Sequence, residues 1–339
     1  MIWTREVPAV RHIAAAVLGC VVMAPVAAHA YLESSVAVGD QIVLLRWEQM
    51  PVRWFATDRG VPGVSVTDFQ AAAARAFAAW QGVSSASLTT EFAGFTSAEP
   101  FDDDGVSVLG FESAPELEHV LGETDYVIDS VTGELLESDI FFNSAFDWSV
   151  ADAGEPSRFD LQSVATHEIG HLLGLGHSAL GETELMAGGG RRVIASGAVM
   201  FPISMGAGRI DDRTLQADDI AGIADLYPAA GYRSRTGAIR GRVLRDGHGV
   251  FGAHVVAFNP STGTLIGGFS LTSDGDFQIT GLTPGAHVIR VEPLDDADVE
   301  SFFDAGTVDL DFIVTFYPRL FVAPEGGVGE HIDVMVRPK

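Results

Sequence analysis

Cysteine occurs once in this sequence of 339 residues, at Cys20. A single cysteine forms no intramolecular disulfide, so the fold must be held by its hydrophobic core and by any bound metal. Lysine is also scarce, and 46 acidic residues against 20 basic ones give a formal charge of -26. A net field of this sign repels nucleic acid and anionic membrane surfaces, which argues against a nucleic-acid partner.

The first thirty residues have the three parts of an export signal. Two arginines form a basic start, an apolar run follows, and Ala28-His29-Ala30 has the small-x-small form of a cleavage site. We therefore expect residues 1–30 to be a signal peptide cleaved after Ala30, and the remaining chain to be secreted. No second apolar stretch is long enough to predict a membrane span.

Two other interpretations of this segment stay open. Val17-Leu18-Gly19-Cys20 loosely resembles a lipobox, which would make Cys20 a lipidation site. A membrane anchor is the other alternative, but the apolar stretch is short for a span and Pro25 interrupts it.

The pattern of apolar and turn-forming residues changes near residue 232, and this change divides the rest of the chain into two domains. Residues 31–230 combine helical and strand-like patterns, whereas residues 237–339 show short apolar runs between Gly and Asp turns, joined by a linker-like stretch at 229–237. The predicted helices span 67–81, 160–173 and 215–227, and the predicted strands of the first domain span 47–55, 106–111, 126–129 and 139–142.

The second domain is predicted to be a small all-β antiparallel sandwich. Its predicted strands span 238–244, 254–258, 265–271, 277–280, 287–291 and 331–336. Residues 295–327 are irregular and rich in Phe and Asp, and the pattern predicts only an insertion there.

The residues with the most specific chemistry lie in the stretch THEIGHLLGLGHS, from Thr166 to Ser178. His167 and His171 are four apart, so a helix places both imidazoles on one face. Gly174 can adopt the left-handed conformation that ends a helix, after which the chain turns back and offers His177. Three neutral imidazoles with an open fourth position are typical of a catalytic zinc site.

Glu168 follows the first of these histidines directly, where its carboxylate reaches a water on the metal. The spacing therefore predicts zinc-assisted hydrolysis with Glu168 as the general base, which later passes the proton to the leaving group. The alternative is a helix with incidental histidines. Matching His, Glu, His, Gly and His at these offsets by accident is a rare event.

This long HExxHxxGxxH pattern resembles the metzincin metalloproteases. The resemblance implies a methionine turn beneath the metal, and Ala198-Val199-Met200-Phe201-Pro202 is similar to it. Met186 is a rival for the turn methionine. We prefer Met200, because Pro202 and a predicted helix follow it at suitable spacing.

Within the metzincins, the stretch 45–228 resembles the matrixin branch. Ser178 after the third histidine and the Asp218-Asp219 pair of the third helix carry this resemblance. It implies an α+β catalytic domain with a twisted mixed sheet and three helices, in which the strand at 139–143 borders the cleft. Asp218 and Asp219 are candidate metal ligands, but we interpret them instead as acids at a helix end that bond backbone donors and support the methionine turn. The usual cysteine-switch propeptide is not expected, because no cysteine follows the leader.

Two further features of the first domain are less specific. The stretch between His177 and Met200 is longer than in typical matrixins, and is interpreted as a flexible loop beside the cleft or a tolerated insertion. Acidic residues gather in the upper loops, which suits either calcium or a solvated loop. These are Asp102, Asp103, Asp104, Asp125, Asp129 and Glu134.

The glycine turns of the second domain resemble those of carboxypeptidase regulatory-like sandwiches, and this resemblance implies a non-catalytic accessory module whose partner the sequence does not identify. The prediction for the whole chain is a secreted endopeptidase acting on protein or peptide, with one catalytic zinc. The alternative is a catalytically silent surface binding or adhesion protein, against which Glu168 argues.

Overall fold

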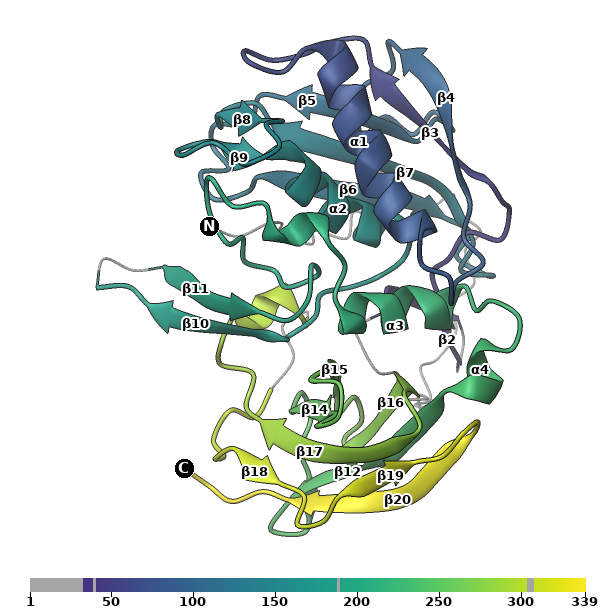
Figure 1. The fold of residues 1–339 in the computed structure, drawn as a ribbon, viewed down its shortest axis with the longest axis vertical. Helices are drawn as coiled ribbons and strands as arrows, with labels where there is room; N and C mark the ends of the chain where they lie inside the picture. The colour runs from purple at the N-terminus through teal and green to yellow at the C-terminus, as the bar shows by residue number, and fades with distance from the viewer. Residues whose placement is uncertain (1–32, 39–40, 188–189, 304–307) are drawn as a thin grey trace.

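The computed structural model describes residues 33–38, 41–187, 190–303 and 308–339. The predicted signal peptide, its cleavage site and Cys20 therefore lie outside the described residues. The described chain forms an upper region built on a helix-covered sheet and a lower region built from strands (Figure 1). Within the described chain, no helix is both long and apolar enough to cross a membrane.

The upper region contains a five-stranded sheet in the order β4-β3-β5-β7-β6. Its strands are β3 (Val52–Thr57), β4 (Thr90–Thr96), β5 (Val108–Glu112), β6 (Gly122–Ile128) and β7 (Leu135–Asn143). Only β6 runs antiparallel to its neighbour, so the sheet is mixed, as predicted. The sequence pattern did not predict β4, whose burial does not alternate cleanly along the strand.

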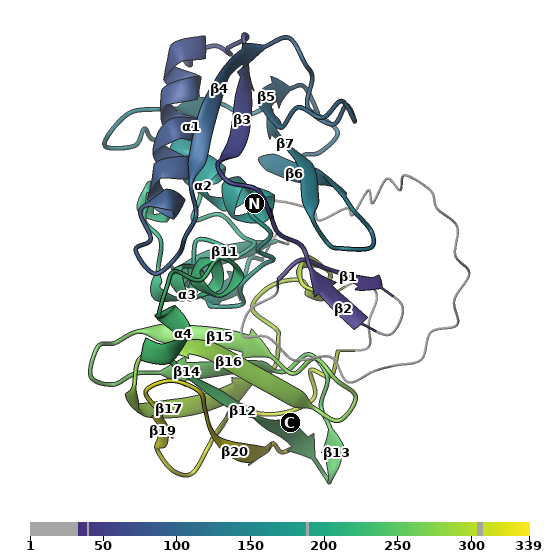
Figure 2. The same ribbon diagram turned by 90° about the vertical axis from the view of Figure 1, so that its right-hand side faces the viewer.

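Three helices accompany this sheet: α1 (Val66–Gln81), α2 (Leu161–Leu172) and α3 (Ala217–Leu226). Each of the first two begins at a side-chain cap. Ser65 accepts a hydrogen bond from the Asp68 amide at 3.2 Å, and Asp160 accepts one from the Ser163 amide at 2.8 Å. Figure 2 shows α1 and α2 on the same side of the sheet.

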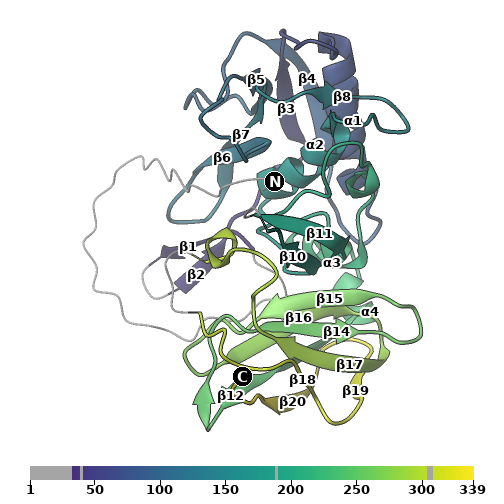
Figure 3. The same ribbon diagram turned by 90° about the vertical axis from the view of Figure 1, so that its left-hand side faces the viewer.

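Shorter elements connect these parts: β1 (Ser35–Val38), β2 (Gln41–Leu44), β8 (Trp148–Ser149), β9 (Phe159–Asp160), β10 (Gly181–Leu185), β11 (Arg191–Ser196), η1 (Asp211–Arg213) and α4 (Tyr232–Arg235). The antiparallel pair β10–β11 projects from the left-hand side of the molecule in Figure 1 and faces the viewer in Figure 3. This hairpin occupies the stretch that the sequence predicted to be a loop or insertion. The predicted linker also has structure, because α4 places Tyr232 in a buried position.

The lower region consists of two sheets. One has the order β13-β12-β16 with β20 on β12, and the other has the order β15-β14-β17-β18 with β19 on β17. The elements are β12 (Gly237–Arg245), β13 (His248–Gly249), β14 (His254–Phe258), β15 (Leu265–Phe269), β16 (Asp276–Leu282), β17 (Gly285–Glu292), η2 (Val299–Ser301), β18 (Thr315–Phe316), β19 (Phe321–Ala323) and β20 (Val328–Met335).

One part of the predicted lower fold is wrong. The closing strand β20 pairs parallel to β12, so its sheet is mixed rather than antiparallel throughout. Parallel pairing needs a long crossover connection. The chain between β12 and β20 supplies one, because it passes through the whole second sheet before returning to the first.

The two regions share one hydrophobic core. A single cluster of buried side chains includes Trp80 and Ile169 of the upper region and Ile239 and Ile289 of the lower one. Polar contacts cross the same boundary, since Thr280 of β16 donates a hydrogen bond to Asp225 of α3 at 3.0 Å. The lower region is therefore packed against α3 rather than tethered by a free linker.

Candidate metal centre and active site

Helix α2 carries the predicted ligands, and all of its residues are buried. Its i, i+4 spacing brings His167 and His171 together, with ring centroids 4.8 Å apart. The helix then ends in a Schellman motif, in which the Gly174 amide donates to the His171 carbonyl at 2.7 Å and the Leu175 amide donates to the Gly170 carbonyl at 3.0 Å.

Gly174 allows the helix to end in this way, because its φ of +98° lies in the left-handed region that favours glycine. A Cβ at this position would also lie 2.3 Å from the Leu45 carbonyl oxygen, so glycine is required for space as well as for conformation. After the turn the chain returns and places His177 beside the other two histidines, with its ring centroid 4.7 Å from that of His171.

Each of the three imidazoles uses Nδ1 to bond a backbone carbonyl. His167 Nδ1 lies 2.7 Å from Val199 O, and His171 Nδ1 lies 2.8 Å from Leu175 O. His177 Nδ1 lies 2.5 Å from Ser301 O. Because a carbonyl only accepts, each Nδ1 must carry the proton, and each Nε2 must present a lone pair.

The three Nε2 atoms converge. Those of His167 and His171 are 3.1 Å apart, and those of His171 and His177 are 3.2 Å apart. Two nitrogens bound to one zinc at about 2.0–2.1 Å in a tetrahedral arrangement would be separated by about 3.3 Å. The three histidines form the one group in the described chain with three metal-ligating side chains close enough to hold an ion, and this donor set fits zinc.

Burial keeps these ligands neutral. It lowers the pKa of His167 to about 3 and that of His177 to about 4, and it lowers the pKa of His171 well below its ordinary value. Neutral imidazoles are the form that binds metal, so the site is ready to bind zinc at neutral pH.

Glu168 is fully buried beside the first histidine. The Thr124 hydroxyl, from β6, donates to Glu168 Oε2 at 2.8 Å. A Cβ at Gly122 would lie 3.1 Å from Glu168 Oε1, so the lack of a side chain there leaves room for the carboxylate. The strand beside α2 is thus β6; the predicted strand at 139–143 lies inside the sheet as part of β7.

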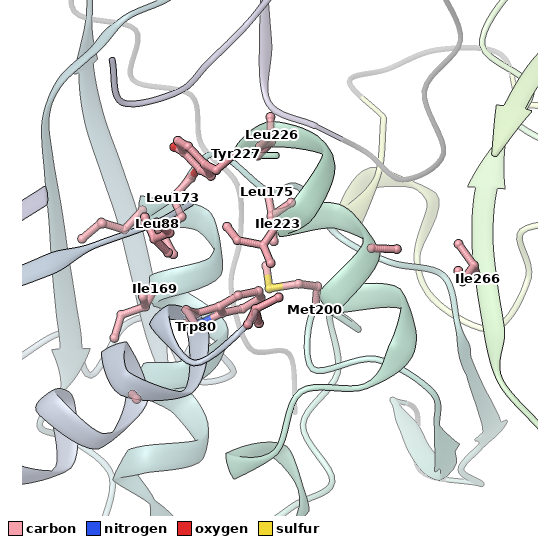
Figure 4. Close-up of a cluster of buried hydrophobic side chains, with 14 of the residues drawn as sticks. Trp80, Leu88, Ile169, Leu173, Leu175, Met200, Ile223, Leu226, Tyr227 and Ile266 are labelled. Atoms are coloured by element: carbon pink, nitrogen blue, oxygen red, sulfur yellow. The ribbon is translucent and has the colours of Figure 1, made fainter. Parts of the chain in front are cut away.

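Met200 packs against α2, in the cluster shown with Trp80 in Figure 4. A Cβ at Gly170 would lie 2.2 Å from the Met200 sulfur, which explains why α2 has a glycine on this face. Met186, the rival residue, is instead largely exposed at the end of β10. Pro202 is buried two residues after Met200.

The two aspartates at the start of α3 have different partners. Asp219 accepts hydrogen bonds from the amides of Val199 at 2.9 Å and Met200 at 3.1 Å, so it braces the segment that contains Met200. Asp218 accepts from the Ser178 hydroxyl at 2.6 Å and from the Gly267 amide of β15 at 2.8 Å. It therefore links the residue after the third histidine to the lower region.

The acidic loops use part of their oxygens on local backbone. Asp104 accepts from the Val106 amide at 2.9 Å, and Asp129 accepts from the Val131 amide at 2.8 Å. The Asp102–Asp104 loop is also held by Glu137, which accepts from the Gly105 amide at 2.6 Å. These contacts fit turn formation, and a calcium site stays a prediction.

Sequence reasoning missed two partners of the site, Thr124 and Ser301. Thr124 lies on a strand that was predicted to start two residues later. Ser301 contributes its carbonyl, which no residue-type pattern reveals. The one hint of a buried contact at this point is the neighbouring Phe302, which lies in the Phe-rich stretch 295–327.

Comparison of the sequence with known proteins identifies a family. The family described as matrixin matches residues 46–228. The chain is 32% identical over 176 residues to Metalloendoproteinase 1 of Glycine max, covering 47% of this chain and 45% of that protein. It is 42% identical over 89 residues to Metalloendoproteinase 5-MMP of Arabidopsis thaliana, covering 24% and 20%. It is 34% identical over 128 residues to Matrilysin of Rattus norvegicus, covering 38% and 34%.

The chain thus spans between 20% and 45% of the length of these relatives. The matched segment covers more than half of the 339 residues, and it contains the three histidines, Glu168 and Met200. On this basis, the chain belongs to the matrixin family.

Proposed function

We propose that this protein is a secreted zinc-dependent endopeptidase. The observation that supports this best is the convergence of three Nε2 lone pairs, each fixed by an Nδ1–H bond to a carbonyl, beside a buried glutamate. A closed structural site would need a fourth protein ligand. The described chain offers three, which leaves a position for water or substrate.

In this proposal Glu168 acts as general base and then as general acid. Its carboxylate takes a proton from the attacking water and delivers it to the leaving amine. The Thr124 hydroxyl bonds Oε2 and so orients the carboxylate. Zinc, when bound by His167, His171 and His177, supplies Lewis-acid activation of the water and of the scissile carbonyl.

The proposed organisation follows from the same reasoning. Residues 1–30 direct export, residues 31–230 form the catalytic domain, and residues 237–339 form a β-sandwich module similar to carboxypeptidase regulatory-like domains. Met200 is the proposed turn methionine, and Gly174, Pro202, Asp218 and Asp219 are proposed as structural support of the site. The substrate is protein or peptide, and calcium in the upper acidic loops is a secondary proposal.

Cleavage of unfolded casein tests the proposal. The zinc-loaded protein should cut casein, a chelator should abolish cleavage, and added zinc should restore it. A protein that binds zinc but cuts neither casein nor a peptide library would instead be the catalytically silent binding protein. A protein that hydrolyses a different class of bond would require another substrate for the same site.

A further inference from the structure

The third histidine is supported differently from the first two. The carbonyls that accept from His167 and His171 belong to Val199 and Leu175, both inside the matrixin-matched segment. The carbonyl that accepts from His177 belongs to Ser301, 124 residues further along the chain and outside that segment. A backbone group of the lower region therefore fixes the tautomer of a metal ligand.

The segment that carries this carbonyl is firmly placed. Phe302 is buried, and its ring lies 6.1 Å from the His177 ring and 5.7 Å from the Phe269 ring of β15. It belongs to a small hydrophobic cluster that also contains Ala179, two residues after His177, and Phe201 of the methionine turn. This cluster therefore connects the segment after His177 with the segment after Met200, and it is separate from the main hydrophobic core.

A second anchor comes from the β10–β11 hairpin. The Thr183 amide donates to Asp296 Oδ1 at 2.9 Å, and the Thr183 hydroxyl donates to the Asp296 carbonyl at 2.5 Å. On the other strand, Arg191 Nε lies 3.7 Å from Asp298 Oδ1. The hairpin and the stretch 295–303, which begins the insertion predicted at 295–327, are therefore joined by polar contacts, and they lie side by side in Figure 1.

We infer that the stretch 296–302 is a positioning element of the metal centre, and that zinc affinity depends on it. The Ser301 carbonyl keeps the proton of His177 on Nδ1, which leaves Nε2 available to the ion. Phe302 and the Thr183–Asp296 contact hold that carbonyl in place. Without them the His177 ring is free to rotate, and part of the ligand set is lost before zinc binds. The inference rests on the proposed zinc site but not on the proposed peptidase reaction.

Zinc affinity of full-length variants, measured by competition with a chelating dye, tests this. Phe302→Ala should weaken zinc binding about 10–100-fold, the range typical of groups that orient a metal ligand. Phe302→Leu keeps an apolar group against His177 and should stay within about threefold of the parent. The matched control is Phe303→Ala. Phe303 belongs to the same segment as Phe302, but its ring packs against the rings of Phe251 and Phe269, whereas the ring beside His177 is that of Phe302.

The spectroscopic readout is the Nδ1–H resonance of His177 in protein labelled with ¹⁵N-histidine, assigned by its absence from His177→Gln. The parent and Phe303→Ala should show it, and Phe302→Ala should lose it through exchange with water. If Phe302→Ala does not fold, Thr183→Val replaces it, with Glu184→Gln as control. Thr183→Val removes only the hydroxyl anchor and should weaken zinc binding about 3–10-fold.

Two results would overturn the inference. One is a folded Phe302→Ala, or in its place Thr183→Val, that binds zinc within about twofold of the parent. The other is a loss in Phe303→Ala as large as that in Phe302→Ala, which would show general packing rather than ligand positioning. A parent that binds no zinc would refute the proposed function itself, so the two failures are distinguishable.

Discussion

The matrixin-matched region and the region after Gly237 contribute different kinds of chemical group to the metal centre. The matched region supplies side chains: three imidazoles, the Glu168 carboxylate and the Thr124 hydroxyl. The later region supplies backbone groups, the Ser301 carbonyl for His177 and the Gly267 amide for Asp218. Reactive groups are thus concentrated in one region, while their support is shared by both.

The largest expected effect is on the side-chain chemistry of the matched region. Glu168→Gln should keep zinc bound, because the imidazoles hold it, and should lower casein cleavage about 10²–10⁴-fold through loss of proton transfer. Glu91→Gln, an exposed change on β4, is the matched control and should leave the rate unchanged. Zinc content and cleavage rate are compared in the same preparations. More than about a tenth of the parent activity in Glu168→Gln would mean that another group is the base.

A second change distinguishes two costs of replacing glycine at the end of α2: the cost of the left-handed backbone conformation and the cost of a steric clash. Gly174 and Gly206 have nearly equal φ values, +98° and +96°, but a Cβ clashes with Leu45 O only at Gly174. Gly206→Ala should therefore cost about 1 kcal/mol of unfolding free energy, and Gly174→Ala about 2–4 kcal/mol with weaker zinc binding. Urea denaturation gives both values. Equal losses would show that the close contact with Leu45 is not important.

The adjacent aspartates of α3 test the contact between the two regions. Burial raises the pKa of Asp218 to about 7, so the folded protein binds a proton here that the unfolded chain releases near pH 4. Stability from this group is therefore present at low pH and lost as pH rises through 7. Asp218→Asn keeps an acceptor for the Gly267 amide and a donor for the Ser178 hydroxyl, but it does not ionise. The variant should therefore lack this loss of stability at high pH. Its unfolding free energy should exceed that of the parent by at most about 4 kcal/mol at pH 8 and by little at pH 4.

Asp219→Asn is the comparison variant, and its expected sign is opposite. Both Asp219 oxygens accept from backbone amides, and an asparagine would turn a donor toward one of them. It should lower the unfolding free energy by about 1–3 kcal/mol at pH 4. Burial also raises the pKa of Asp219, to about 6, so part of this loss should be offset at pH 8. Denaturation curves at pH 4 and pH 8 distinguish the pair. If both variants behave alike, the distinction between a local brace and a link between the regions is wrong.

The smallest expected effect concerns Thr124. Thr124→Val removes the hydroxyl that bonds Glu168 Oε2 and should lower kcat about tenfold with KM little changed. Thr124→Ser keeps the hydroxyl and should restore most of the rate. A shift in the acidic limb of the pH–rate profile in the valine variant would identify an effect on the carboxylate itself. A valine variant with the parent profile would show that Thr124 does not position the base.

The sequence predicted the features that depend on local spacing. His167, His171, Gly174 and His177 follow from helix geometry and one left-handed turn, and the helices around them follow from apolar periodicity and caps. Features formed by distant backbone groups left no such signal. The Ser301 carbonyl is common to every residue type, so nothing in the sequence marks it.

One element and one strand direction were missed for a related reason. The hairpin β10–β11 combines GETEL with RRVIAS around glycines, a composition that favours a loop until the strands pair. The parallel pairing of β20 could not be predicted either, because the direction of a strand depends on the path of the chain through the second sheet rather than on any single segment.

Metal analysis tests the central claim most directly. After exhaustive dialysis the protein should retain one zinc per chain, and His167→Ala should retain none, because the remaining two imidazoles hold the ion too weakly. Asp129→Asn, in an exposed acidic turn, should retain one zinc and serves as the control. Two tightly held zinc ions in the parent, with one surviving in His167→Ala, would contradict a single catalytic site at these three histidines.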